Sequence, residues 1–463
     1  MPEPSMSASQ RLLAAGLVLG VTLVAFEVTA VITALPTITN ELGGDALYGV
    51  TLAAYTLANL VALVAAGELA DRHGPTKPYA TSILLFVIGL VVAATAPAMW
   101  VIVVGRVLQG LGTGAFGTIA YLLVKRAFPD ERQPLVFAVL SAGWVLPSLI
   151  APAISGAVTE HLGWRWVFLG IVPLAVGVGL LAVRPMAAFG PTGAAAGPTR
   201  IPAAFAAAVG VGAVVTGLQF ANLVAAGLTT IAGAVLAVVF LGRLFPRGVV
   251  AARPGLPAAI ACRILATATF LGVDSFVPLA ADRIHGASPT LQGFVIVGSA
   301  VMWTAGQWVI AKRPNIRPNR AVLAGFGCLL AGIVLVAPVL HDGWPLWATF
   351  VAWSVGGLGM GLLFNPTTVA AMSFAESGSE GKVGGQVSLA DSVGFSLMGG
   401  IGGAMVALAD RTSLSLTSAL GINFAIAAVL ACTGMVASRH VARAPGSAAA
   451  GAGTAPAPSA APA

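Results

Sequence analysis

Long apolar stretches separated by short polar connections run along almost the whole chain. Fourteen of them have the roughly 20 residues that a helix needs to cross a bilayer. Only residues 219–222 can form a turn between the seventh and eighth runs, so a count of twelve is the alternative, and either count leaves both termini on the same side. The runs cover residues 12–35, 47–70, 78–97, 99–124, 134–158, 164–186, 202–221, 223–245, 256–281, 292–311, 321–340, 344–373, 383–408 and 414–438.

Composition excludes a soluble globular domain. The chain is 58% hydrophobic and 8% charged, whereas a soluble surface needs about 25% charged residues. The three cysteines, Cys262, Cys328 and Cys432, lie within apolar runs, so we expect neither disulfides nor a metal cluster. The N-terminal segment lacks the basic start and the cleavage site of a removed signal peptide. We therefore expect the first run to stay in the mature protein as a span.

Basic residues are distributed unequally between the two sets of loops. Of the 23 lysines and arginines, 18 lie in the termini and alternate loops, three lie in the opposite loops and two lie inside runs. Because cytoplasmic loops carry the excess of Lys and Arg, the pattern predicts that both termini are cytoplasmic. No basic stretch is interleaved with aromatic residues, so the basic pI is not that of a nucleic-acid-binding protein.

The runs repeat weakly as two six-helix units. The fourth run contains Gln109-Gly110-Leu111-Gly112 and the twelfth contains Gly356-Gly357-Leu358-Gly359, while Gly67 and Gly306 each precede a basic loop. The first and ninth runs carry one acid each at corresponding places, Glu27 and Asp274. Duplicated units with a site at their interface are typical of secondary transporters. The predicted organisation is an N-terminal bundle (1–186), a cytoplasmic linker (187–201), an inserted helix pair (202–246), a C-terminal bundle (254–439) and a disordered cytoplasmic tail (440–463).

Ionisable residues inside the runs are the first candidates for function, because a charge in hydrocarbon is costly unless it is paired or hydrated. Glu27 and Arg106 both lie roughly 10–12 Å below the outer face, so they can interact in one polar layer. Gln109 is one turn from Arg106 and can join them. The plainer interpretation is a purely structural ion pair.

A second pair of matched depth lies in the inner half of the membrane, where Arg263 and Asp391 are each seven or eight residues from the cytoplasmic end of their runs. A structural ion pair is again the alternative. Asp274 has no base at its own depth. We therefore expect Asp274 to carry a transported proton and Glu27 to respond to a cationic substrate.

Several motifs resemble those of the major facilitator superfamily. GELADRHGPTKPY, which begins at Gly67, is similar to the signature loop of that superfamily, and RVLQGLGTGA, which begins at Arg106, is similar to its fourth-helix motif. Residues 143–156, the following GWRWVF and the ALP of the first run resemble the 14-helix drug:proton antiporter group. Ala151 and Ser155 stand where that antiporter motif has glycines, Pro75 stands where the loop has a base, and Glu27 stands in place of the usual aspartate.

The resemblance implies an all-α membrane protein of the major facilitator fold, with two six-helix bundles in a pseudo-twofold arrangement plus an inserted helix pair, fourteen transmembrane helices in all. It implies two roles for small and charged residues of the motifs. Ordinary close packing is the alternative for the glycines, and a solvated loop pair at a helix C-terminus is the alternative for Asp71 and Arg72. The residues implied in conformational gating are Gly67, Asp71, Arg72 and Gly74, and those implied in helix packing are Pro152, Gly156, Gly110 and Gly112.

The expected function is proton-coupled export of amphiphilic or drug-like molecules by alternating access. Transport of a native lipid or metabolite and a non-transporting scaffold or sensor are the alternatives. No GxxxxGK[ST] motif or histidine cluster with metal-ligand spacing occurs, so we expect no enzyme activity, no cofactor and no metal, with the proton gradient as energy source. The expected partners are a small-molecule substrate, protons and the lipid bilayer, without nucleic acid, for a monomer in the plasma membrane. Trp144, Trp303 and Trp353 are candidates for the apolar wall of the site, although tryptophans at the membrane interface or in ordinary packing are commoner.

Overall fold

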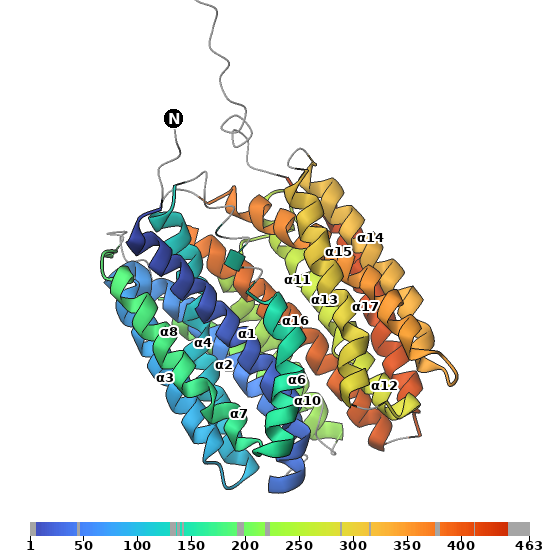
Figure 1. Cartoon of the computed structure of the whole chain (residues 1–463). Helices are drawn as coiled ribbons and strands as arrows, with labels where there is room; N and C mark the ends of the chain where they lie inside the picture. The colour runs from blue at the N-terminus through green and yellow to red at the C-terminus, as the bar shows by residue number, and fades with distance from the viewer. Residues whose placement is uncertain are drawn as a thin grey trace, which may run out of the picture.

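The structure, a computed structural model, describes residues 6–43, 47–129, 136, 139–140, 143–191, 199–217, 223–287, 289–313, 316–375, 380–411 and 413–442. Long helices lie side by side in two groups (Figure 1). The N-terminal group contains α1 (Ala8–Leu42), α2 (Tyr48–His73), α3 (Thr76–Ala94), α4 (Met99–Ala127), α6 (Val145–His161), α7 (Arg165–Leu169) and α8 (Ile171–Met186). After α9 (Ile201–Gly217) and α10 (Leu223–Leu244), the C-terminal group contains α11 (Leu256–Asp274), α12 (Val277–His285), α13 (Pro289–Ala311), α14 (Pro318–Val336), the short η2 (Ala337–Leu340), α15 (Leu346–Met372), α16 (Glu380–Arg411) and α17 (Leu416–Ser438).

Every predicted run coincides, over its described residues, with a helix or with two consecutive helices; parts of the runs 134–158 and 202–221 fall outside the described residues. Within the described chain, eleven helices are long and apolar enough to cross a membrane. Residues 201–214 of α9 form a shorter apolar helix. The protein is therefore a multi-pass membrane protein, and the count of fourteen spans stays a prediction. The predicted tail lies almost entirely outside the described residues, as does the core of the linker, 192–198.

The same helix contacts occur in both groups. In the N-terminal group α4 packs against α2 and α3, and α1 packs against α6 and α8. In the C-terminal group α15 packs against α13 and α14, and α11 packs against α16 and α17. The pair α9 and α10 is different, because α9 packs against α10 and also touches α2 and α16 from the two groups. The weak sequence repeat thus corresponds to a repeated packing scheme, with α9 of the inserted pair in contact with both groups.

Glycines on α4 and α15 let neighbouring helices approach closely at equivalent places. A Cβ atom on Gly110 would lie 2.2 Å from the carbonyl oxygen of Tyr55 on α2, and a Cβ atom on Gly357 would lie 2.0 Å from the carbonyl oxygen of Ser299 on α13. A Cβ atom on Gly112 would lie 2.6 Å from the backbone nitrogen of Phe86 on α3. These positions need glycine because no other residue lets the two backbones come so near.

The surroundings of other motif residues differ from these close contacts. A Cβ atom on Gly156 would meet no described atom within 4 Å, so the described packing does not require glycine there. The side chain of Pro152 is outside the described part of the chain. Gly306 approaches the Leu358 carbonyl closely, whereas Gly67 would meet only the Thr118 methyl group at an ordinary 3.4 Å. The two glycines that precede basic loops therefore meet different surroundings, and only Gly306 lies against a neighbouring backbone.

These contacts predict opposite outcomes for two alanine substitutions. Gly110→Ala should lower the free energy of unfolding by about 1–3 kcal/mol, since the added methyl group overlaps the α2 backbone. Gly156→Ala, where the described surroundings leave room, should change stability by less than about 0.5 kcal/mol. Thermal unfolding of both variants in detergent provides the comparison. Equal melting temperatures for the two variants would contradict the packing role of Gly110.

Candidate functional site

A buried polar cluster joins three helices of the N-terminal group. Glu27 of α1 and Arg106 of α4 are 0% and 1% exposed, and they form a salt bridge through Arg106 Nη1 and Glu27 Oε1. The same Nη1 donates to Gln109 Oε1 at 2.8 Å. The guanidinium carbon of Arg106 lies 4.1 Å from the ring centroid of Tyr55 on α2, a cation–π contact. The structure therefore brings together Glu27, Arg106 and Gln109, as their depths predicted, and adds Tyr55.

Several donor and acceptor atoms of this N-terminal cluster have no hydrogen-bond partner among the described residues. Glu27 Oε2, Arg106 Nε and Gln109 Nε2 are buried and have no hydrogen-bond partner among the described residues. Most buried polar groups in proteins do have partners, and unpartnered ones are costly. Three such atoms around one ion pair distinguish the cluster from a fully satisfied structural salt bridge.

Asp274, the acid that corresponds to Glu27 in the C-terminal group, has neutral hydrogen-bond partners. We call Glu27 and Asp274 the two outer acids. Its Oδ1 accepts hydrogen bonds from Trp353 Nε1 on α15 at 2.7 Å and from the Ser299 hydroxyl on α13 at 3.0 Å. The Ser299 hydroxyl also lies 2.8 Å from the Ile296 carbonyl oxygen, and its single proton serves one acceptor at a time. None of the salt bridges among the described residues involves Asp274.

The two outer acids are equivalents in the repeat. Glu27 and Asp274 are 247 positions apart in the sequence, as are Arg106 and Trp353. In each group the first span (α1 or α11) carries the acid and the fourth span (α4 or α15) carries its principal partner. The second span (α2 or α13) supplies one further side chain, which contacts Arg106 in the N-terminal group and Asp274 in the C-terminal group. One site therefore has an arginine where the other has a tryptophan. Sequence reasoning matched the two acids but missed the match of Arg106 with Trp353, which the alignment of Gly110 with Gly357 contains.

The inner pair, Arg263 of α11 and Asp391 of α16, is more completely bonded. Arg263 Nε and Nη2 donate to the two Asp391 carboxylate oxygens at 2.5 and 2.9 Å, and Nη1 donates to the Phe364 carbonyl at 2.7 Å and to the Thr368 hydroxyl at 2.9 Å. The arginine side chain is 3% exposed, whereas the aspartate side chain is 31% exposed. Helix α16 also packs against α2 and α4, so this pair lies on a helix that joins the two groups.

Aromatic rings connect the outer acid to the inner ion pair within the C-terminal group. Trp353 stacks on Phe270 at 5.4 Å between centroids, Phe270 meets Trp303 edge-on at 5.2 Å, and Trp303 meets Phe364 at 5.1 Å. The Arg263 guanidinium carbon lies 3.2 Å from the Phe364 centroid. Trp303 and Trp353 were expected in an apolar wall, and Phe270 and Phe364 were not foreseen. Trp144 is half exposed and takes no part in the described ring contacts.

Two ion pairs and a glycine with a positive φ angle lie at the signature loop. Asp71 Oδ1 lies 3.7 Å from Arg126 Nη2 of α4, and Arg72 pairs with Glu68 one turn earlier at 2.7 Å. Gly74 adopts a φ of +80°, a conformation that favours glycine. The loop prediction named Asp71, Arg72 and Gly74 but missed Arg126 and Glu68.

Glu68 also ties this loop to the beginning of α9. Its Oε2 accepts hydrogen bonds from the Thr199 hydroxyl and from the Arg200 backbone N–H, each at 3.1 Å. The end of α2 is thus in direct contact with the chain that leads into the inserted pair.

Comparison with known proteins now decides the family. The sequence profile described as Major Facilitator Superfamily matches residues 17–399. The chain belongs to the major facilitator superfamily. Its members are transporters of small molecules rather than enzymes. The geometry described above is therefore that of a transporter with polar sites in both bundles.

Relatives agree with this assignment. A probable multidrug-efflux transporter of Mycobacterium tuberculosis is 28% identical over 448 residues, which cover 90% of this chain and 92% of that protein. Multidrug resistance protein 3 of Bacillus subtilis is 24% identical and covers 84% of this chain and 78% of that protein.

Solved structures show the same fold. The proton:xylose symporter XylE has a TM-score of 0.65 at 12% identity, covering 93% of this chain and 95% of that one. The human organic anion transporter MFSD10 has a TM-score of 0.62 at 14% identity, covering 93% and 99%. At these identities the likeness concerns the fold alone.

Proposed function

We propose that this protein is a proton-coupled exporter of amphiphilic or drug-like molecules that works by alternating access. The observation that carries the proposal is the pair of equivalent acids, one neutralised by an arginine and the other held by neutral donors. The multidrug-efflux relatives support the substrate class. The proposal includes fourteen spans, cytoplasmic termini, a location in the plasma membrane, a monomeric state and no cofactor, with the proton gradient as energy source.

Proton coupling follows from the difference between the two acid sites. Protonation of Glu27 leaves Arg106 as a buried cation without its counterion, which is strongly unfavourable. Protonation of Asp274 leaves no such cation, because its partners Trp353 and Ser299 are neutral. Its Oδ2 has no hydrogen bond among the described residues, so a proton placed there leaves the two bonds to Oδ1 in place. Asp274 is therefore the proposed proton carrier.

The substrate class follows from the walls of the C-terminal site. Trp303 and Phe364 are partly exposed, and Arg263, which lies over the Phe364 ring, pairs with the partly exposed Asp391. Aromatic faces attract cations and apolar surfaces alike, and Asp391, whose side chain is 31% exposed, adds an acidic group that pairs with Arg263. An amphiphilic cation with a planar ring system fits this combination.

Transport by purified protein in proteoliposomes with an imposed pH gradient is the direct test. Matched cationic, neutral and anionic compounds should be compared, with the gradient collapsed by an ionophore as control. We expect gradient-dependent flux that favours cations. Flux of a lipid or metabolite but of none of the drug-like compounds would select the native-substrate alternative. Absence of flux for every compound from correctly inserted protein would favour a scaffold or sensor.

The signature loop gives a separate prediction about gating. Asp71→Asn weakens the contact with Arg126 that we propose holds the cytoplasmic end closed, so transport should fall by roughly tenfold or more while the protein remains folded. Asp282→Asn removes an acid from an exposed ion pair with Arg283 and should leave transport unchanged. Initial rates in proteoliposomes, corrected for the amount inserted, measure both. A wild-type transport rate in Asp71→Asn would contradict the proposed gating role of the Asp71–Arg126 contact.

A further inference from the structure

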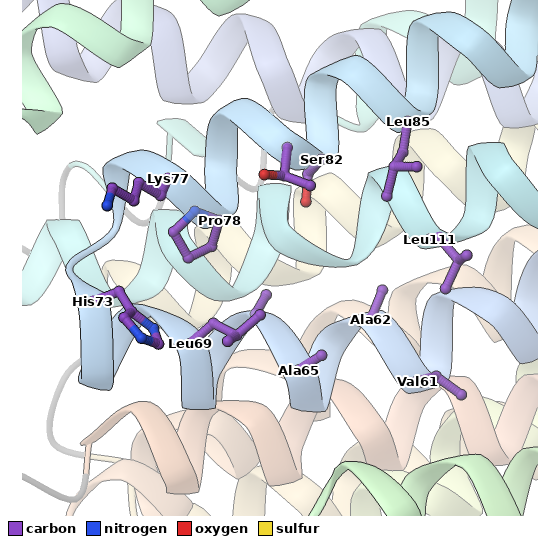
Figure 2. Close-up of a pocket in the computed structure, with 12 residues that line it drawn as sticks. Val61, Ala62, Ala65, Leu69, His73, Lys77, Pro78, Ser82, Leu85 and Leu111 are labelled. Atoms are coloured by element: carbon purple, nitrogen blue, oxygen red, sulfur yellow. The ribbon is translucent and has the colours of Figure 1, made fainter.

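A groove of about 320 Å³ lies on the surface of the N-terminal group between α2 and α3 (Figure 2). Ala65 and Leu69 of α2 form one wall and Leu85 of α3 lies on the other side, with Leu111 of α4 at the far end. His73 and Lys77 lie at the opposite end, next to the connection between α2 and α3. The groove is thus an apolar channel with a basic entrance, and the transport mechanism does not use it.

The position of the groove places it against lipid. Leu69 within it is 37% exposed, and Leu84 beside it on α3 is 59% exposed. In a membrane-spanning bundle such exposed apolar side chains face hydrocarbon. Along α2 the lining extends from Val61 to His73, about 18 Å at the rise of an α-helix. That length is close to the depth of one leaflet of a hydrocarbon core about 30 Å thick.

The basic entrance is available to an anion. The neighbouring charges Arg72 and Glu68 pair with each other, and Asp71 pairs with Arg126. By contrast, in the part of the chain that the structure describes, neither His73 nor Lys77 forms a salt bridge or a hydrogen bond, and both are exposed.

A hydroxyl group inside the groove is also without a protein partner. Ser82 is 7% exposed and lines the groove. Its side chain has no hydrogen bond with any other described residue. A hydroxyl group that lines an apolar groove can form a hydrogen bond with a polar group of a ligand.

We propose that the groove binds one acyl chain of an anionic phospholipid, with the headgroup phosphate held by Lys77 and His73. The apolar walls match the chain in length and chemistry, and the unpaired positive charge matches the phosphate. Only the choice of the cytoplasmic leaflet rests on the topology proposed above. The lipid site itself is independent of what the protein transports.

Lipid binding by the full-length protein in detergent tests the proposal. Native mass spectrometry should show stronger binding of phosphatidylglycerol than of phosphatidylcholine. Lys77→Gln should reduce this preference about fivefold. Thr81→Phe, an exposed position on the α3 wall, fills the groove and should weaken binding of both lipids. Lys312→Gln removes an exposed lysine from the α13–α14 connection and serves as the control.

Each of the following outcomes would contradict the proposed lipid site. Unchanged lipid binding in both groove variants excludes it. Loss with Lys77→Gln but not with Thr81→Phe indicates a surface charge contact without an occupied groove. Displacement of phosphatidylglycerol by a drug-like transport substrate assigns the groove to substrate entry instead. Because the readout is lipid binding, none of these outcomes bears on whether the protein couples transport to protons.

Discussion

Glu27→Gln should lower the free energy of unfolding by about 3–5 kcal/mol, because it leaves the Arg106 guanidinium buried without a counterion. Both partners of the salt bridge are almost completely buried. Water therefore cannot compensate for the lost charge, and Arg106 Nε already has no hydrogen-bond partner among the described residues. Equilibrium unfolding in mixed micelles measures the loss.

Two further variants make this test specific. Adding Arg106→Gln to Glu27→Gln removes the orphaned cation and should recover part of the loss. Glu41→Gln breaks a salt bridge on the same helix, but there both side chains, Glu41 and Arg165, are about half exposed, so the change should be only about 0.2–1 kcal/mol. A double variant no more stable than the sum of the two single losses would show that Glu27 and Arg106 are not energetic partners.

Asp274→Asn should abolish transport driven by a pH gradient, with a fall of roughly a hundredfold or more if a coupled cycle requires a proton at this position. Asparagine still accepts the hydrogen bonds from Trp353 and Ser299, so folding and substrate binding should persist. Substrate-induced proton release from purified protein and counterflow without a gradient separate coupling from binding. We expect proton release to disappear while counterflow continues.

The equivalent residue of the other bundle is the matched control. Glu27→Gln should keep substrate-induced proton release. It should weaken the binding of cationic substrates more than that of neutral ones, because it removes negative charge beside Arg106. Undiminished proton release in Asp274→Asn would reassign the proton site, with Glu27 as the next candidate.

Much of this architecture follows from residue order alone, since a membrane imposes strong local constraints. A helix must be apolar for about 20 residues to cross the hydrocarbon, so the positions of the helices are visible in the sequence. Depth also follows from residue number through the fixed helical rise. For that reason the pairing of Glu27 with Arg106 and of Arg263 with Asp391 was predictable without coordinates.

These local constraints do not determine the direction in which each side chain points around its helix axis. Whether Trp353 or a cation faces Asp274 depends on how α11, α13 and α15 rotate against one another, and close backbone contacts at glycines such as Gly357 set that rotation. The chain of ring contacts through Phe270 and Phe364 also depends on how the helices rotate against one another. The open space around a Cβ atom placed on Gly156 also depends on this packing.

The sequence by itself thus determined the membrane class, the helix positions, the duplicated plan and the depth of each charge. Only the tertiary structure decided that the two equivalent acids differ in their partners, that Asp71 meets Arg126, and that an apolar groove lies beside Lys77. The physical reason is that hydrophobicity and helical rise act along the chain. Partner choice instead depends on the packing of residues far apart in sequence, where a single methyl group at a glycine is enough to change the fit.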